Sequence, residues 1–219
     1  DLSFEVESID YDFKGTGIIR KIVNISFYGY SFPIKVFVPN SEKKPVPACV
    51  YIMHEYQTEC HDLDNDVNAS VVPILNITKR GYAVAVMTTI NVAYDFEHHD
   101  EHKSGVFSAF SSKRNDSSWA TISAWAWGAS RVMDYLETDC DIDKNRIGVV
   151  GHSRSGKASL WCGATDTRFS FVISNNSGGT GSAMTRGKDG EKIKDINITD
   201  WLCKNYQKYN EREEMLPVD

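Results

Sequence analysis

Hydrophobic residues along the chain fall into short runs whose spacing alternates between that of strands and that of helices. Residues 19–30 and 33–38 alternate apolar and polar positions, which predicts two antiparallel strands joined near Gly29. Residues 48–53 (ACVYIM) are continuously apolar, as is typical of a strand buried on both faces. Residues 1–40 are therefore expected to form an antiparallel β region that leads into a buried sheet.

The middle of the chain continues this alternation. A helix is expected over about 67–80, and residues 82–90 (YAVAVMTTI) predict a second buried strand. Residues 91–116 are polar and are expected to form a surface excursion. A longer helix is predicted over 118–139, capped by Ser118. Side chains spaced by three and four positions are expected to form its buried face: Trp119, Ile122, Ala126, Ala129, Met133 and Leu136.

Three more elements follow this helix. Residues 146–150 (RIGVV) predict a strand, 157–161 (KASLW) a helix and 168–174 (RFSFVIS) a further strand. Strands that alternate with helices imply an α/β fold, with a mostly parallel sheet flanked by helices on both faces. The length of 219 residues suits a single domain over 1–219.

Composition and charge restrict the partners of this domain. Hydrophobic residues make up 41% and charged residues 25% of the chain, which is ordinary for a globular protein. A formal net charge of −6 gives no general attraction to nucleic acid or to anionic lipid. No apolar run reaches the roughly 18 residues of a membrane span. We therefore expect neither nucleic acid nor a membrane as a partner.

Metal ligation is not favoured either. The five cysteines form no C-x-x-C pair and show no metal-ligand spacing, so we expect no zinc site and mostly free thiols, with one incidental disulfide left open. The run of acidic residues and histidines at 97–102 lies in the polar excursion, without the i, i+4 spacing of ligands on a helix. A solvated loop is favoured there over a metal site, and no organic cofactor is expected.

Residues 148–159 (GVVGHSRSGKAS) fit two kinds of chemistry. A phosphate-binding loop needs Ser or Thr directly after its lysine to ligate Mg²⁺, but Ala158 follows Lys157. A nucleophile elbow needs a strand that breaks sharply into a helix around a serine, with small residues beside it. Gly151 supplies a small residue, and Ser153 would lie at a helix N-terminus, where free N–H groups favour a developing negative charge. The elbow is the better fit.

The residues around this serine resemble a known family. GHSRSGKASLWCGATDTRFSFVISNNSGG (151–179) resembles the G-C-S-R-x-G-K-G-A-L segment of glucuronoyl esterases, carbohydrate esterase family 15. The resemblance is strongest to the bacterial branch and its acetyl-xylan-esterase-like relatives. It covers roughly residues 80–219 in separated blocks that occur in the same order. It implies an α/β-hydrolase fold, in agreement with the predicted sheet.

The resemblance implies roles for four residues. Ser153 would be the nucleophile, against the alternative of an ordinary cap hydroxyl. Arg154 would face the forming oxyanion with its backbone N–H and guanidinium, against the alternative of a surface arginine. Lys157 would bind the hydroxyls of a uronic sugar, and Trp201 would cover apolar C–H faces of that sugar. A solvated lysine and a core indole are the alternatives.

An acid and a base are harder to assign. Asn176 stands where fungal-type members carry the triad acid, and an amide cannot stabilise an imidazolium as a carboxylate does. No histidine follows Ser153, although the base follows the nucleophile in α/β-hydrolases. His152 is rejected as the base because neighbours across an elbow point in different directions. His54 and Glu55, which follow a predicted strand, are kept as candidates for an oxyanion loop.

Together these features predict a serine carboxylic-ester hydrolase of plant cell-wall polysaccharide, acting through an acyl-Ser153 intermediate. The expected substrate is glucuronoxylan, at the ester between its 4-O-methyl-glucuronoyl groups and a lignin alcohol. An acetyl xylan esterase and a non-catalytic or truncated carbohydrate-binding relative are the alternatives. The substrate class favours a secreted or periplasmic location. We also expect an N-terminal portion of a longer enzyme, without its C-terminal strands, acid and histidine, that by itself turns over an ester hardly at all.

Overall fold

The structure is a computed structural model that describes most of the chain. Among the sequence features discussed above, Glu55, Cys60 and the run at 97–102 lie outside the described residues. The candidate roles of Glu55 and of that run therefore stay predictions. The described residues are 1–41, 43–54, 57, 62–95, 104–110, 113–187, 189–196 and 201–217.

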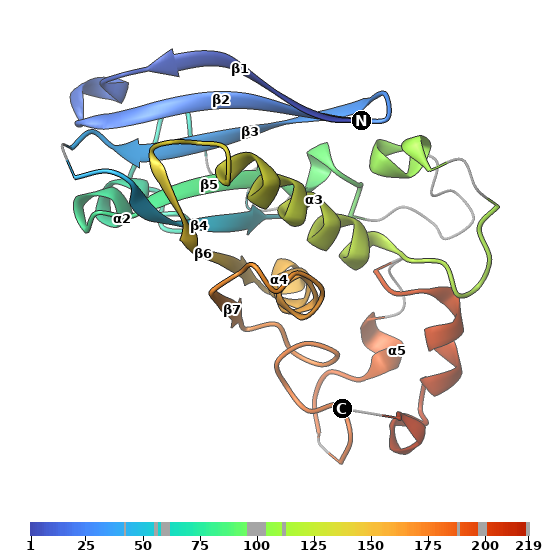
Figure 1. Cartoon of the computed structure of the whole chain (residues 1–219). Coiled ribbons are helices and arrows are strands. Elements are labelled where there is room, and N and C mark those ends of the chain that lie inside the picture. Colours follow the sequence, from blue (N-terminus) through green and yellow to red (C-terminus); the bar gives the residue numbers. More distant parts are fainter. Residues whose placement is uncertain are drawn as a thin grey trace.

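A seven-stranded mixed sheet forms the centre of the fold (Figure 1), with the strand order β1-β2-β3-β5-β4-β6-β7. Three neighbouring pairs, β1–β2, β2–β3 and β3–β5, are antiparallel. Three others, β4–β5, β4–β6 and β6–β7, are parallel. The strands are β1 (Leu2–Asp10), β2 (Ile18–Phe27), β3 (Tyr30–Pro39), β4 (Val46–Met53), β5 (Ala83–Thr88), β6 (Ile142–His152) and β7 (Phe171–Asn175).

The prediction of a mostly parallel sheet is therefore wrong, although the hairpin near Gly29 is confirmed. Tyr28 and Gly29 have φ values of 44° and 79°, as a two-residue hairpin turn requires, and Phe27 pairs with Tyr30 across it. Such a turn permits only antiparallel pairing. Strand β1 lies within the antiparallel β region expected over 1–40, although it was not predicted as a separate strand; it extends this antiparallel half and is mostly exposed.

Helices cover both faces of the sheet, as predicted. Helix α2 (Ile74–Lys79) packs with Phe37, Met53 and Val84 in a core on one face. Helices α3 (Thr121–Leu136) and α4 (Arg154–Thr165) pack on the opposite face. The other helical segments among the described residues are α5 (Ile193–Ile196) and the 3-10 helices η1 (Phe13–Gly15), η2 (Thr89–Asn91), η4 (Gly105–Ala109), η5 (Lys204–Tyr209) and η6 (Glu213–Met215).

Helix boundaries differ from those predicted. Helix α2 begins at Ile74 and is shorter than expected. Helix α3 begins at Thr121 rather than after Ser118, whose hydroxyl instead accepts a hydrogen bond from the Asn115 backbone N–H at 2.8 Å. Trp119 precedes the helix and is half-buried, whereas the other residues of the predicted face are buried. No helix in the described part of the chain combines the length and apolar character needed to span a bilayer.

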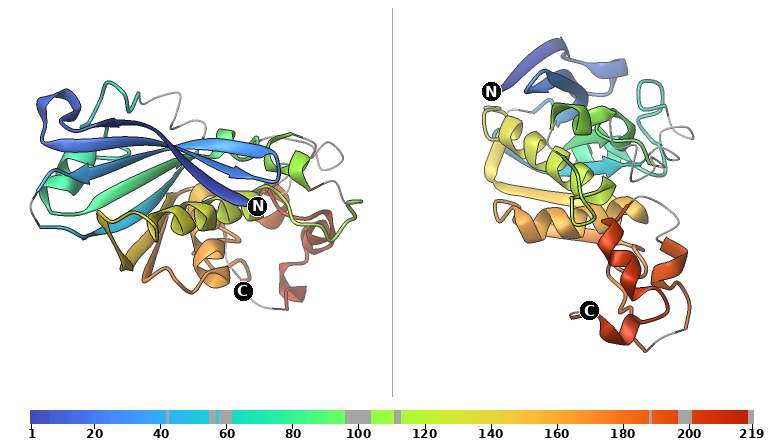
Figure 2. Two further views of the ribbon diagram at one scale, coloured as in Figure 1. Left: turned by 45° about the horizontal axis from the view of Figure 1, so that its top comes forward. Right: turned by 90° about the vertical axis from the view of Figure 1, so that its right-hand side faces the viewer.

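The segment after β7 joins the start of α3. The Ile122 N–H donates to the Trp201 carbonyl at 3.1 Å, and the Asn205 N–H donates to the Asp116 carbonyl at 2.9 Å. Figure 2 shows this C-terminal segment projecting beyond the edge of the sheet that β7 forms. The segment thus places Trp201 near α3 and α4.

Candidate active site

The carboxyl ends of the parallel strands bring the candidate residues to one edge of the sheet. His54 directly follows β4, Ser153 follows β6, and Asn176 follows β7. Asp95 lies a few residues beyond β5. In open α/β sheets this edge is the usual place for a ligand site.

Ser153 occupies the sharp turn between β6 and α4. Its φ of 55° and ψ of −125° are strongly disfavoured for a residue with a Cβ, at a cost of about 1–3 kcal/mol. The Ser153 N–H donates to the Asn175 carbonyl at 2.9 Å, which fastens the turn to the end of β7. Strand, strained serine and helix occur in the order predicted for a nucleophile elbow.

The residues around Ser153 explain how the turn is held. A Cβ on Gly151 would lie 2.0 Å from the Ser155 carbonyl oxygen, so only glycine fits there. Ser155 stands where the common G-x-S-x-G pattern has its last glycine. Its hydroxyl donates to the His152 carbonyl at 2.8 Å and accepts from the His152 N–H at 3.1 Å. The Ser155 side chain therefore ties the end of the strand to the start of the helix.

Arg154 is anchored rather than free in solvent. Its Nη1 donates to Asp95 Oδ2 at 2.6 Å, and its guanidinium lies 4.9 Å from the centre of the Trp201 ring. The Trp201 indole N–H donates to Asp95 Oδ1 at 2.8 Å. The Asp95 side chain is 1% exposed. The structure therefore brings Arg154 and Trp201, two of the predicted site residues, into contact with each other.

Sequence reasoning missed Asp95 because it lies in the polar stretch assigned to a surface excursion. For the described part of 91–116 that prediction is wrong, since Val92, Ala93, Val106 and Phe107 are also buried. The adjacent apolar residues Val92 and Ala93, just after β5, are the signal that could have revealed this. Asp95, which follows this pair two residues later, is buried with it.

Lys157 is also buried, at 5% exposure, so the alternative of a solvated helix lysine is wrong. Its ammonium donates to the carbonyls of Ser177 and Gly179, the latter at 2.5 Å. The Glu191 carboxylate lies 3.6 Å away and accepts from the Gly179 N–H at 2.8 Å. Lys157 thus holds the turn that follows β7, and its role toward a sugar stays a prediction.

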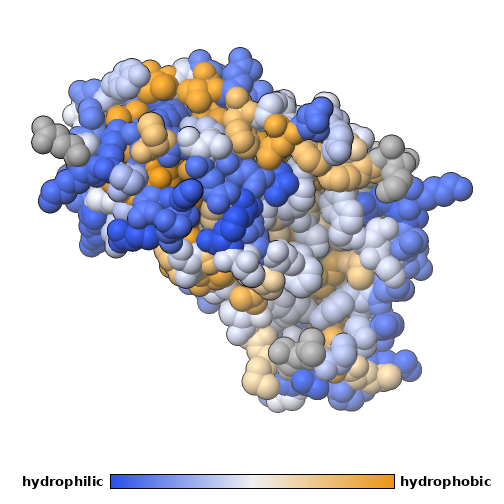
Figure 3. All heavy atoms as spheres, in the orientation of Figure 1, coloured by the Kyte–Doolittle hydropathy of each residue, from blue (hydrophilic) through white to orange (hydrophobic). Residues whose placement is uncertain are grey.

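A pocket of about 770 Å³ lies between the start of α3, helix α4 and η5. Pale and orange atoms surround the hollow in this region of Figure 3. Its volume is that of a small-molecule site. Lys157 and Trp201 both border the pocket, together with mainly apolar side chains that include Trp119, Ile122, Leu160, Trp161 and Leu202.

His54 is buried at the same edge of the sheet, 4% exposed. The pKa of His54 is lowered to about 4, first by burial and then by the positive charge of Arg154 and the nearby His152, against the opposing effect of Asp95. The rings of His54 and His152 are stacked at 6.5 Å, and His152 Nδ1 lies 3.1 Å from Asn175 Nδ2. His54 is therefore neutral at pH 7.

This histidine predicts a loss of stability in acid. The pKa of His54 is about 4 in the folded protein and 6.5 as its ordinary value, so between these values the unfolded chain binds more protons. The free energy of unfolding is expected to fall as the pH falls from 6.5 toward 4, by about 2–3 kcal/mol between pH 7 and 4.5. Urea denaturation of the wild type and of His54→Gln at both pH values measures the difference. An equal pH dependence in the two proteins would contradict the assignment.

The described residues contain one group of side chains that could hold a metal ion. Asp139, Cys140 and Asp141 form a group of potential ligands, but Lys21 Nζ lies 2.7 Å from Asp139 and 2.8 Å from Asp141. This group therefore forms an ion-pair network.

Asn176 is exposed and has a φ of 53°. The cysteines of the described residues are free thiols: Cys49, Cys140, Cys162 and Cys203.

A strained serine between a parallel strand and a helix, at the carboxyl edge of a sheet with helices on both faces, defines a protein of the α/β-hydrolase class. Residues 23–219 match the family model for glucuronyl esterases of fungi. The chain therefore belongs to the glucuronyl esterase family. The resemblance to carbohydrate esterase family 15 is confirmed.

Individual relatives agree with this membership. The carbohydrate esterase MZ0003 of an unknown prokaryotic organism is 39% identical over 170 residues, which cover 74% of this chain and 38% of that protein. A 4-O-methyl-glucuronoyl methylesterase of Podospora anserina is 34% identical over 110 residues, 45% of this chain and 23% of the relative. A glucuronoyl esterase structure from Solibacter usitatus superposes with a TM-score of 0.87 at 32% identity, over 100% of this chain and 63% of its own. The chain thus spans less than two thirds of the length of these relatives.

Proposed function

We propose that this protein is a serine carboxylic-ester hydrolase that acts on 4-O-methyl-glucuronoyl esters of glucuronoxylan. The observation that carries the proposal is Ser153, held at a strained turn between β6 and α4 with Arg154 directly after it. A stable protein retains such strain where the conformation serves a function. The names of the relatives, 4-O-methyl-glucuronoyl methylesterase and glucuronoyl esterase, support the substrate class.

In this mechanism the Ser153 hydroxyl oxygen attacks the ester carbonyl carbon and loses its proton to a base. The carbonyl oxygen becomes an oxyanion, beside the first N–H groups of α4 and the Arg154 guanidinium. Collapse of this intermediate expels the alcohol and leaves an acyl-Ser153 ester. Water then attacks that ester, releases the uronic acid and restores the serine.

Hydrolysis of benzyl glucuronate, compared with release of acetate from acetylated xylan, tests the substrate, measured on a form of the enzyme as long as its relatives. We expect a higher kcat/KM on the glucuronate ester. Equal or greater activity on acetylated xylan would instead support the second candidate, an acetyl xylan esterase. One observation favours that candidate: the Lys157 ammonium is already bound by two backbone carbonyls, which leaves it fewer protons for a uronic sugar.

Lys157→Met separates the two substrates further. If this ammonium binds the sugar, kcat/KM on benzyl glucuronate should fall about 10–100-fold, the range for a lost hydrogen bond to a charged group. Hydrolysis of an aryl acetate by the same variant should change less than about threefold, because that ester has no sugar hydroxyls. Equal losses on the two esters would show that Lys157 acts through the turn that it holds.

A further inference from the structure

Asp95 occupies a position that links three separate parts of the chain. It follows β5, and its carboxylate binds Arg154 at the start of α4 and Trp201 in the C-terminal segment, 59 and 106 residues away. The backbone carbonyl of Asp95 accepts a second, longer hydrogen bond from the Trp201 indole N–H at 3.2 Å. Each carboxylate oxygen thus has its own donor.

The segment that carries Asp95 is itself fixed. The indole N–H of Trp125, a fully buried residue of α3, donates to the Ala93 carbonyl at 2.9 Å. Val92 packs in the same core. Asp95 is therefore attached to the rigid part of the fold, and its carboxylate has little freedom to move.

Arg154, by contrast, has a long side chain that is 23% exposed. An unanchored arginine samples many rotamers, and ordering it at the moment of reaction raises the barrier. Asp95 holds one end of the guanidinium at 2.6 Å, and the Trp201 ring supports its flat face at 4.9 Å. Arg154 is thus already ordered before a substrate binds.

From these contacts we propose that Asp95 is a positioning residue that fixes the Arg154 guanidinium beside Ser153 and makes the Trp201 indole part of the same unit. The effect on catalysis rests on the proposed function, whereas the fixed geometry does not. Asp95 acts through Arg154 and does not touch the reacting atoms. It matters most when negative charge develops on the ester oxygen.

The geometry is tested without turnover, by ¹H–¹⁵N NMR of the full chain. The Trp201 indole signal is identified by its loss in Trp201→Phe, and the Arg154 Nε–H signal by its loss in Arg154→Lys. In Asp95→Asn we expect the indole signal to shift and its hydrogen exchange to accelerate at least about tenfold, with broadening of the Arg154 signal. Unchanged signals in this variant would overturn the proposal.

Asp166→Asn is the matched control. It removes a carboxylate that is 10% exposed and pairs with Arg168 at 2.7 Å, at the opposite end of α4. This variant should leave both signals in place. Shifts of the same size in Asp166→Asn would mean that the signals report a general loosening of the fold, which would also overturn the proposal.

The catalytic effect is measured on benzyl glucuronate. Asp95→Asn should lower kcat about 10²-fold with KM within about twofold, because a displaced oxyanion donor is lost in the transition state. Trp201→Phe keeps the ring beneath the guanidinium and should lose less than about tenfold. A raised KM with unchanged kcat in Asp95→Asn would overturn the positioning role. If a wild type as long as its relatives hydrolyses no ester, the proposed function fails, and the NMR result still decides whether Asp95 fixes Arg154.

Discussion

In a form of the enzyme as long as its relatives, replacing Ser153 by alanine is expected to abolish acyl-enzyme formation and to reduce ester hydrolysis by about 10⁴-fold or more. Alanine lacks the oxygen that attacks the carbonyl carbon, and the neighbouring N–H groups then have no oxyanion to stabilise. Stability should change little, because alanine at this position has the same strained φ of 55°. Incubation with an activated ester followed by intact-mass analysis measures the acyl group, and thermal denaturation measures the fold.

A second variant, Ser153→Gly, tests the strained backbone at this residue. Ser153→Gly also removes the hydroxyl, but glycine adopts the φ of 55° without a steric penalty. We expect Ser153→Gly to be more stable than Ser153→Ala by about 1–2 kcal/mol, since relief of about 1–3 kcal/mol of strain is partly offset by the greater entropy of the unfolded glycine chain.

Two outcomes would contradict this account. An acyl adduct that forms on Ser153→Ala at the wild-type rate would place the nucleophile elsewhere. A Ser153→Gly variant less stable than Ser153→Ala would show that the turn is not strained as the backbone angles indicate. If both variants lose the adduct and Ser153→Gly is the more stable, the strained backbone at residue 153 lowers the stability of the protein, and the serine hydroxyl is required for acyl-enzyme formation.

The sequence predicted the elements that depend on local spacing. The hairpin at Gly29, the buried runs that became β4 and β5, and the strand–serine–helix order around Ser153 each arise from residues close together in the chain. Their side-chain periodicity and turn chemistry are visible without knowledge of the rest of the fold. The family resemblance supported the prediction of a nucleophile elbow at Ser153.

What the sequence could not show depends on residues far apart. Strand β3 pairs antiparallel with β5 rather than with β4, and this pair joins the antiparallel half of the sheet to the parallel half. The hydrophobic pattern of a buried strand does not tell which strand it pairs with. Asp95 appeared as one carboxylate in a polar stretch, because its partner Arg154 lies 59 residues later. Nothing in the sequence indicated the backbone partners of Lys157, because the Ser177 and Gly179 carbonyls lie on the turn after β7.

The partners of Lys21 also lie far from it in the sequence. Its replacement is expected to have the largest effect on stability. Lys21 lies on β2, with a side chain only 10% exposed, and pairs with Asp139, whose side chain is 3% exposed. Asp141 pairs with the same ammonium at 2.8 Å, and the Tyr135 hydroxyl donates to Asp139 at 2.9 Å. Burial lowers the pKa of Lys21, but the hydrogen bonds to Asp139 and Asp141 and the negative charges of these residues together raise it by more, so the ammonium stays charged.

Lys21→Met is expected to lower the free energy of unfolding by about 3–5 kcal/mol, because it leaves the buried Asp139 carboxylate without its cation. The same substitution at Lys35, on the neighbouring strand β3, is the control. Lys35 pairs at 2.7 Å with Asp64, whose side chain is 49% exposed, so Lys35→Met should cost less than about 1 kcal/mol. Urea denaturation of the two variants measures both values.

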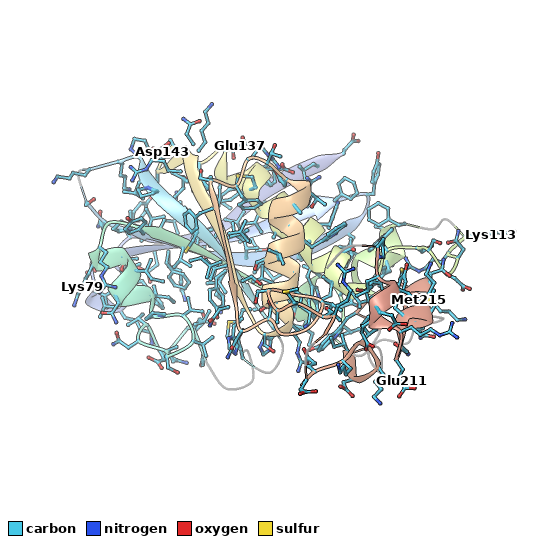
Figure 4. All side chains as sticks on the ribbon, turned by 90° about the horizontal axis from the view of Figure 1, so that it is seen from below. Lys79, Lys113, Glu137, Asp143, Glu211 and Met215 are labelled. Atoms are coloured by element: carbon cyan, nitrogen blue, oxygen red, sulfur yellow. The ribbon has the colours of Figure 1, made fainter. Side chains whose placement is uncertain are left out.

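A double variant distinguishes loss of the charge partner from loss of packing. Asp139→Asn in the Lys21→Met background removes the unpaired charge and should recover part of the lost stability. Figure 4 shows Glu137 and Asp143, on either side of Asp139 in sequence, near the top of the view and well apart from Met215 in the C-terminal segment. Activity per folded molecule should therefore be unchanged in Lys21→Met. If Lys21→Met costs no more than Lys35→Met, the network contributes nothing beyond an exposed ion pair, and the burial of its charges does not govern the stability of this end of the sheet.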